Sequence, residues 1–174
     1  NILRYIYDMG RGQGKTKKSG SPVALRRRPS RPTPRPGECR PVLMSLSPVW
    51  SEKILDGSKT IELRRTRSGC EKNSPIIIYT SFPRKRIDGK CRVERVLNLP
   101  LSELWEKTKH GCGCTEEEFY EYFKGKESGY GIVLEDVERI DPVELPFDGP
   151  QSFRYLFDDE DDQKAVLDLI GFSS

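Results

Sequence analysis

The sequence is short of long hydrophobic runs and of histidine, and both shortages exclude common classes of protein. Its apolar runs, such as residues 76–79, stay far below the roughly 20 apolar residues that a membrane helix needs. The first residues also lack the apolar centre of a secretion signal, because Arg4 and Asp8 interrupt them. His110 is the sole histidine, which excludes a multi-histidine metal centre and disfavours a Ser/His catalytic triad. We therefore expect a soluble cytoplasmic protein with no membrane partner.

Cysteines are few, and their number does not suit a disulfide framework. The chain has 5 of them, an odd count that fits a reducing compartment. The stretch from His110 to Cys114 holds two and offers soft ligands for a metal. However, its C-x-C spacing differs from the C-x-x-C of zinc knuckles, and no second pair has a comparable spacing. A structural turn is the favoured interpretation, and we expect neither a metal nor a cofactor.

Charge is distributed unevenly along the chain. The net charge is +3, yet residues 1–41 hold 11 basic and 2 acidic residues, whereas residues 42–174 hold 19 and 25. Within that second part, residues 59–95 are cationic, with 11 basic and 4 acidic residues, and residues 96–174 are anionic. Such asymmetry attracts polyanions, although exposed charge often serves only as a solvated surface.

Residues 1–41 are predicted to form a disordered basic arm. Repeated prolines among Arg, Gly and Ser forbid helices and strand ladders there. The arm either contacts phosphates or is a segment outside the domain, and the sequence leaves both interpretations open. Residues 10–16 end like a phosphate-binding loop, but Met9 stands where the G-x-x-x-x-G-K-[ST] spacing needs glycine. No helix pattern follows, so a nucleotide triphosphatase is disfavoured.

From residue 42 onward the pattern is globular. Ser47 and Pro48 open a predicted helix that Gly57 ends, with Trp50 and Ile54 on one face. The continuous apolar run at residues 76–80 predicts a buried strand. The periodicity predicts further strands at residues 42–46, 89–96, 130–134 and 151–155, and further helices at residues 101–108, 115–125, opened by a Thr115/Glu118 capping box, and 158–170.

A short motif at residues 57–65 combines cations and a carboxylate on one predicted strand. Alternation along a strand places Thr60, Glu62 and Arg64 on one face and Lys59, Ile61, Leu63 and Arg65 on the other. The two aliphatic residues belong in the core. We therefore expect Glu62 and Arg64 on a solvent-facing surface, close enough to neutralise each other or to contact a polar ligand together.

The motif resembles the signature of ASCH domains, a branch of the PUA-like β-barrel superfamily. Gly57, Lys59, Glu62 and Arg64 stand at the spacing G-x-K-x-x-E-x-R. Residues 43–56, 104–108 and 149–156 are similar to further family segments, in the family's order, so the resemblance covers roughly residues 42–156. It implies an α+β protein with a small PUA-like β-barrel flanked by helices. We expect the domain at residues 42–174, including a C-terminal helix, after the disordered basic arm at residues 1–41.

The first functional hypothesis is nucleic-acid binding, because PUA-like folds commonly bind RNA. RNA is the favoured polymer, and the resemblance leaves DNA open as the alternative. RNA processing or transcription is the expected setting. Basic residues interleaved with aromatic ones suit this role. The residues expected to contact phosphates are Lys59, Arg64, Arg65, Arg84 and Lys85. Tyr79 or Phe82 is expected to stack on a base. Glu62 is expected either to orient Arg64 or to accept a hydrogen bond from a base amino group.

The alternative is a small amidohydrolase acting on a modified nucleoside. The resemblance implies this because a subgroup of ASCH proteins deacetylates N4-acetylcytidine with the motif lysine and a threonine three residues later. Lys59 occupies the first position, but Glu62 stands in place of the threonine. Lys59 and Glu62 would instead form an acid/base pair for another hydrolysis.

Two further interpretations stay open. Glu62 and Arg64 would form only a surface ion pair in a purely structural interpretation, worth about 0–1 kcal/mol. A regulatory module would use the acidic C-terminal half to contact a basic protein partner.

Overall fold

The structure, a computed structural model, describes residues 41–156 and 161–171. The predicted basic arm lies outside the described residues except for Pro41. Within the described ranges, no helix has the length and apolar composition to cross a membrane. The elements are strands β1 (Val42–Leu46), β2 (Ile61–Arg64), β3 (Pro75–Thr80), β4 (Arg86–Pro100), β5 (Ser128–Glu144) and β6 (Phe153–Tyr155), and helices α2 (Pro48–Leu55), α3 (Leu101–Thr108), α4 (Glu116–Tyr122) and α5 (Asp161–Leu169).

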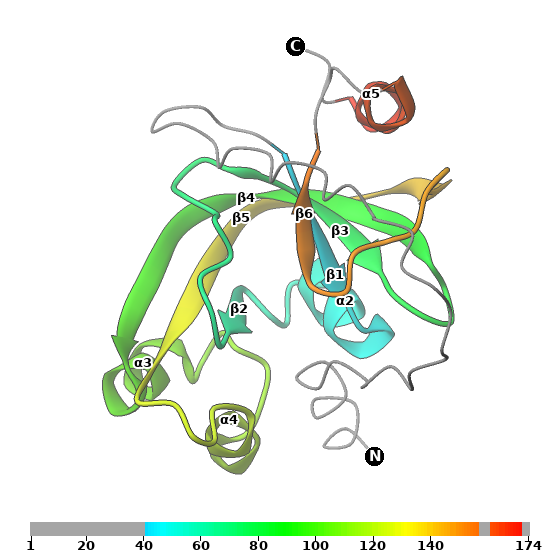
Figure 1. Cartoon of the computed structure of the whole chain (residues 1–174). Helices are drawn as coiled ribbons and strands as arrows, with labels where there is room; N and C mark the ends of the chain where they lie inside the picture. The colour runs from blue at the N-terminus through cyan, green and yellow to red at the C-terminus, as the bar shows by residue number, and fades with distance from the viewer. Residues whose placement is uncertain (1–40, 157–160, 172–174) are drawn as a thin grey trace, which may run out of the picture.

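One strongly bent six-stranded sheet organises the described residues (Figure 1), in the order β2-β5-β4-β3-β1-β6. β1 and β3 are parallel, and the other neighbours are antiparallel. The long β4/β5 ladder shifts register at three places, and such bulges bend a strand and increase its twist. The predicted α+β fold with a barrel-like sheet and flanking helices is confirmed. The sheet is a half-barrel, because β2 and β6 stand at opposite edges of it.

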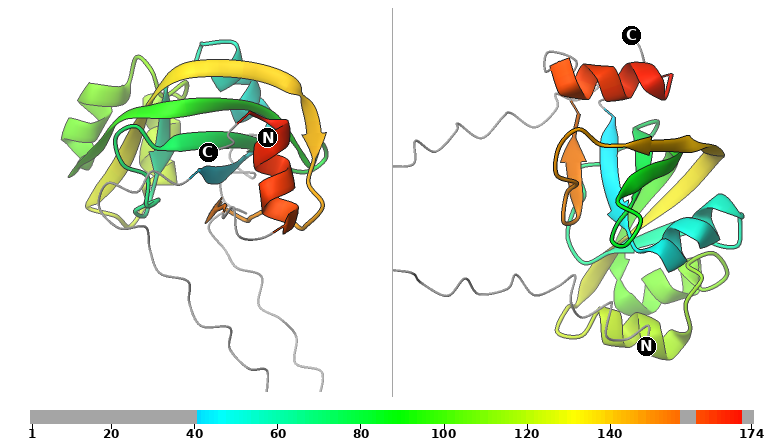
Figure 2. Two further views of the ribbon diagram at one scale, coloured as in Figure 1. Left: turned by 90° about the horizontal axis from the view of Figure 1, so that it is seen from above. Right: turned by 90° about the vertical axis from the view of Figure 1, so that its right-hand side faces the viewer.

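Apolar clusters pack against both faces of the central strands. Along β1, Met44 packs in one apolar cluster with Ile76 and Ile78 of β3, while Leu43 packs in a second cluster with Ile77. Burial on both faces explains the continuous apolar run that predicted β3. The first cluster includes Ile54 of α2, the second receives α5, and a third contains residues of α3 and α4. Figure 2 shows α5 at the opposite end of the sheet from α3 and α4.

Two strands are much longer than their sequence pattern predicted. β4 spans Arg86–Pro100 and β5 spans Ser128–Glu144, whereas apolar alternation marked only residues 89–96 and 130–134. The added residues are mostly partly or fully exposed, so they carry no apolar pattern. The β4/β5 ladder continues beyond the core, and these residues pair with each other there. Pairing between two exposed strand ends leaves no trace in hydrophobic periodicity.

The predicted capping box at the start of α4 is confirmed. The Oγ1 atom of Thr115 accepts a hydrogen bond from the backbone N–H of Glu118 at 3.3 Å, and Glu118 Oε2 accepts one from the backbone N–H of Thr115 at 3.0 Å. Both bonds satisfy backbone donors that have no partner within the helix. They fix where α4 begins, directly after the loop at residues 111–114.

We expect Thr115→Ala to lower the free energy of unfolding by about 1 kcal/mol, because a backbone donor of α4 loses its acceptor. Thr115→Ser keeps the hydroxyl and should stay within about 0.5 kcal/mol of the wild-type protein. Urea denaturation followed by circular dichroism measures both differences. An equal loss in the two variants would show that the methyl group, and not the cap, carries the effect.

Candidate functional site

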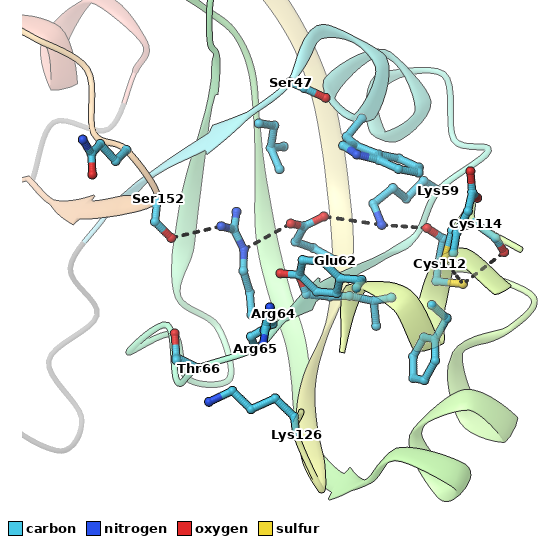
Figure 3. A pocket seen from close by; sticks show the side chains of 17 residues that line it. Ser47, Lys59, Glu62, Arg64, Arg65, Thr66, Cys112, Cys114, Lys126 and Ser152 are labelled. Carbon is cyan, nitrogen blue, oxygen red and sulfur yellow. Dashed lines mark hydrogen bonds and ion pairs between the residues drawn. The ribbon is translucent and has the colours of Figure 1, made fainter. Parts of the chain in front are cut away.

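A pocket of about 450 Å³ opens between the two free edges of the half-barrel and the loop that joins α3 to α4 (Figure 3). One wall comes from β2, another from the end of β1 and the start of α2, and a third from α4. Residues 151 and 152, just before β6, complete the rim. The lining residues are Leu46, Ser47, Trp50, Lys59, Glu62, Leu63, Arg64, Arg65, Thr66, Cys112, Cys114, Glu118, Phe119, Tyr122, Lys126, Gln151 and Ser152.

Glu62 lies between two cations in this pocket. Its Oε2 atom is 3.4 Å from Lys59 Nζ, and its Oε1 atom is 3.1 Å from Arg64 Nε. All three residues are buried, with 3% of Lys59, 8% of Glu62 and 7% of Arg64 exposed. The expectation of a solvent-facing surface for Glu62 and Arg64 is therefore wrong. The two do share a face, as alternation predicted, but elements from elsewhere in the chain cover that face.

Lys59 lies on the same side as Glu62, and the prediction that it lies on the opposite face is wrong. Strand alternation does not apply to it, because β2 begins only at Ile61. Lys59 belongs to the turn that follows Gly57, whose φ of 82° ends α2 in the left-handed region. Its ammonium donates hydrogen bonds to the backbone oxygens of Ile61 and Cys112, both at 2.7 Å. Lys59 thus joins the motif to the loop at residues 111–114.

Arg64 reaches across the open side of the half-barrel. Its guanidinium donates to Ser152 Oγ at 3.1 Å, beside β6, and to the backbone oxygen of Ser45 in β1 at 3.3 Å. The Nε atom forms an ion pair with Glu62, but its N–H does not point at an acceptor and stays without a hydrogen bond. The guanidinium is thus held by contacts with β1, β2 and the segment before β6.

The outer part of the pocket adds cations and aromatic rings. Arg65 is half-buried and Lys126 is exposed. The Trp50 ring lies 5.2 Å from Lys59 Nζ and 4.9 Å from Lys53 Nζ, distances typical of cation–π contacts. Tyr122 donates its hydroxyl to a backbone oxygen of β2, and burial raises the pKa of this phenol. The aromatic rings of Trp50 and Tyr122 are of the kind that stacks on a planar ligand.

Trp50, Tyr122 and Lys126 line the pocket although the sequence pattern did not predict them as site residues. Trp50 was predicted only to share a helix face with Ile54, and Lys126 was given no role. Their positions in the pocket depend on how α2, α4 and the segment after α4 pack beside the edge of β2, and these contacts are long-range. The basic and aromatic character of the segment around Tyr122 and Lys126 was the available signal.

Several predicted nucleic-acid-binding residues lie outside the pocket. Tyr79 is buried in the second apolar cluster. Phe82 is 65% exposed in the turn between β3 and β4, with Lys85 Nζ 5.9 Å from its ring. The structure therefore separates these three residues from Lys59, Glu62 and Arg64. Their contact with nucleic acid stays a prediction.

Arg84 is engaged in a partly exposed ion-pair cluster at the surface. Glu52 of α2 pairs with Arg84 and with Arg139, and Arg84 also lies 3.6 Å from Asp88. Hydrogen bonds from Arg139 and Arg84 lower the pKa of Glu52 to about 2. This cluster fastens α2 to the β4 and β5 strands and does not border the pocket. Within the described ranges, no group of three His, Cys, Asp or Glu side chains could hold a metal ion.

Comparison with known proteins gives one consistent result. The model of the ASCH domain family matches residues 44–143. An ASCH domain-containing ribonuclease of Zymomonas mobilis is 29% identical over 132 residues, which cover 71% of this chain and 88% of the relative. The crystal structure of ASCH from Zymomonas mobilis has a TM-score of 0.67 at 26% identity, covering 74% of this chain and 95% of that one.

Two further similarities add to these. The crystal structure of a mutant ASCH protein from Zymomonas mobilis, with phenylalanine in place of a tyrosine, has a TM-score of 0.68 at 24% identity and covers 75% of this chain and 98% of that one. The large ribosomal subunit protein uL22 of Ureaplasma parvum is 22% identical over 120 residues, which cover 66% of this chain and 39% of the relative.

Glu52 and Glu62 provide a matched test of the buried site, since each carboxylate lies between two cations. We expect Glu62→Gln to lower the free energy of unfolding by about 3–5 kcal/mol, because it leaves two buried cations without a counter-charge. Glu52→Gln should lower it by about 0–1 kcal/mol, because its side chain is 37% exposed and water screens its pairs. Urea denaturation of both variants measures the difference. Equal losses would contradict the claim that burial makes the Glu62 pairs special.

Proposed function

The chain belongs to the ASCH domain family, and we propose that its pocket binds single-stranded RNA. The main support is the composition of the pocket. Lys59, Glu62 and Arg64 form a buried row of ion pairs there, and further cations and aromatic rings line the pocket around them. The relative named as a ribonuclease supports RNA as the polymer. The buried motif disfavours the interpretation of Glu62 and Arg64 as a surface ion pair.

The charge of the pocket favours an anionic ligand. Four cations line it, and they outnumber its two carboxylates. Glu62 already lies between Lys59 and Arg64, and Glu118 accepts a hydrogen bond from the backbone at the start of α4. Arg65 and Lys126 are the more exposed cations, so we assign them to contacts with the phosphates of the strand. Such contacts position a strand without specifying its sequence.

The size and walls of the pocket favour one unstacked base. Its volume of about 450 Å³ lies within the range of roughly 300–1,000 Å³ that is usual for small-molecule sites. A base can enter only from a single strand, loop or end, where it is free to leave its neighbours. Trp50 or Tyr122 then offers a ring for stacking.

Lys126 and Lys124 provide a matched test of RNA binding, because both are exposed and only Lys126 lines the pocket. We expect Lys126→Ala and Arg65→Ala each to weaken binding of the full chain to a fluorescein-labelled single-stranded RNA. Each should also reduce the slope of log affinity against log salt by about 1. Lys124→Ala should leave affinity and slope close to the wild-type values. Fluorescence anisotropy across a salt series measures both quantities.

Equal effects of the three substitutions would assign the affinity to general surface charge or to the basic arm. No binding by any form would overturn the proposed function.

A second candidate function is RNA cleavage, favoured by the name of the relative and by a Lys–Glu pair in the pocket. In the reaction, the 2′-oxygen of a nucleotide attacks the adjacent phosphorus and the bond to the 5′-oxygen breaks. Glu62 would accept the proton of the 2′-hydroxyl, and Lys59 would donate one to the leaving 5′-oxygen. Arg64 would stabilise the charge that develops on the phosphate. These roles retain the predicted acid/base pair.

We expect the full chain to cleave a labelled RNA and to leave a DNA of the same sequence intact, because DNA lacks the attacking 2′-hydroxyl. Denaturing gel electrophoresis of the products measures cleavage. Lys59→Gln should abolish it while circular dichroism confirms folding, and Lys124→Ala should not change it. Intact RNA under all conditions would exclude the ribonuclease candidate. Release of acetate from N4-acetylcytidine in a parallel assay would favour the amidohydrolase alternative.

A further inference from the structure

Two thiols face each other on the wall of the pocket. Cys114 donates a hydrogen bond to the sulfur of Cys112, with the two Sγ atoms 3.4 Å apart (Figure 3). The intervening residue is Gly113, whose φ of 72° lies in the left-handed region. Glycine adopts this conformation without strain, and it folds the loop so that side chains two residues apart point the same way. This arrangement goes beyond the structural turn that the C-x-C spacing predicted.

The surroundings of the pair favour a reactive sulfur. Cys112 is buried and Cys114 is half-buried, and both line the pocket. The hydrogen bond from Cys114 lowers the pKa of the Cys112 thiol to about 6, and the nearby charge of Lys59 acts in the same direction. The same hydrogen bond and burial raise the pKa of Cys114. Cys112 is therefore the more acidic of the two thiols, and the thiolate is the nucleophilic form of a cysteine.

The other described cysteines have a different environment. Cys70 and Cys91 are buried in the first apolar cluster, and burial raises the pKa of both thiols. Buried apolar thiols of this kind are inert. Reactivity is therefore concentrated at the loop between α3 and α4.

We propose that Cys112 and Cys114 form a redox-active dithiol that a hydroperoxide converts to a disulfide. Cys114 passes its proton along the hydrogen bond to the Cys112 sulfur as the half-buried Cys114 sulfur attacks the peroxide oxygen. The O–O bond breaks, and the departing hydroxide takes that proton from Cys112, which leaves a Cys114 sulfenic acid, one water and the Cys112 thiolate. The Cys112 thiolate then attacks the Cys114 sulfur and displaces hydroxide, which takes up a proton to give the second water. The two sulfurs are oxidised and the peroxide is reduced. The second step is intramolecular, so the burial of Cys112 does not hinder it.

Disulfide formation would act on the pocket through backbone oxygens of the same loop. The sulfurs must close from 3.4 Å to about 2.05 Å, which moves the loop. The oxygen of Cys112 accepts a hydrogen bond from Lys59, and that of Gly113 accepts one from Lys53, both at 2.7 Å. Displacing these acceptors alters the position of Lys59, and Lys59 contacts Glu62 and lies over the Trp50 ring. The proposal concerns the thiols and is independent of RNA binding.

Tryptic cleavage offers a direct test on the full chain. Cuts after Lys109 and Lys124 release residues 110–124, which contain Cys112 and Cys114 and no other cysteine. Reduced protein is treated with hydrogen peroxide, denatured in N-ethylmaleimide, digested and analysed by mass spectrometry. We expect this peptide to lose two hydrogens and to go from two maleimides to none, while the Cys70 and Cys91 peptides keep theirs. Treatment with dithiothreitol should restore both labels.

Two variants and a spectroscopic measurement complete the test. Cys112→Ser should stop at the Cys114 sulfenic acid, which dimedone traps, whereas Cys70→Ala should behave like the wild-type chain. The indole N–H signal of Trp50 in a nitrogen-15 spectrum should shift on oxidation of the wild-type chain and stay unchanged in Cys112→Ser. A peptide that keeps both maleimides, or a disulfide that joins other cysteines, would overturn the dithiol. A disulfide without a Trp50 shift would overturn its effect on the pocket.

Discussion

The buried carboxylate of Glu62 is the constraint on which the site depends. In the described part of the sheet, β2 and β6 each have one edge without a neighbouring strand, and Arg64 spans the gap with hydrogen bonds to Ser45 and Ser152. A buried guanidinium is stable only with a counter-charge and acceptors, and Glu62 supplies that charge at 3.1 Å. Lys59 completes the chain on the other side. The same three residues therefore hold the edges in place and line the pocket. A substitution at any of them is expected to change both the geometry of the pocket and its charge.

The loop at residues 111–114 connects this chain of charges to the helices. The backbone oxygen of Gly111 accepts hydrogen bonds from the N–H groups of both Thr60 and Ile61, at 2.8 and 2.9 Å, so the loop aligns the start of β2. A side chain at Gly111 would come within 2.5 Å of Thr60 Oγ1, which explains why glycine is needed at that close approach. The loop ends at Thr115, where the capping box begins α4. Backbone contacts of this loop thus fix the start of α4 relative to the motif.

Local patterns predicted much of this fold, and long-range contacts account for what they missed. Alternation correctly placed Glu62 and Arg64 on one face, and a continuous apolar run correctly indicated β3, because both depend on neighbouring residues alone. The family itself followed from the motif and is confirmed by the match of residues 44–143. Burial of the charged face could not be predicted, since it requires knowing that residues 45, 112 and 152 meet there. The position of Lys59 depended on where β2 begins, and strand ends are the least predictable part of such patterns.

Glu52 and Glu62 show why charge pattern alone does not identify a site. Both carboxylates lie between two cations, and both belong to segments with several basic neighbours in the sequence or the fold. The side chain of Glu52 is 37% exposed, so water screens its ion pairs and weakens them. Glu62 is 8% exposed and borders a cavity, where the effective dielectric is lower and each charge acts more strongly on whatever enters. Burial beside an open cavity therefore distinguishes a pocket that can bind or react from an ion pair that only fastens two elements together.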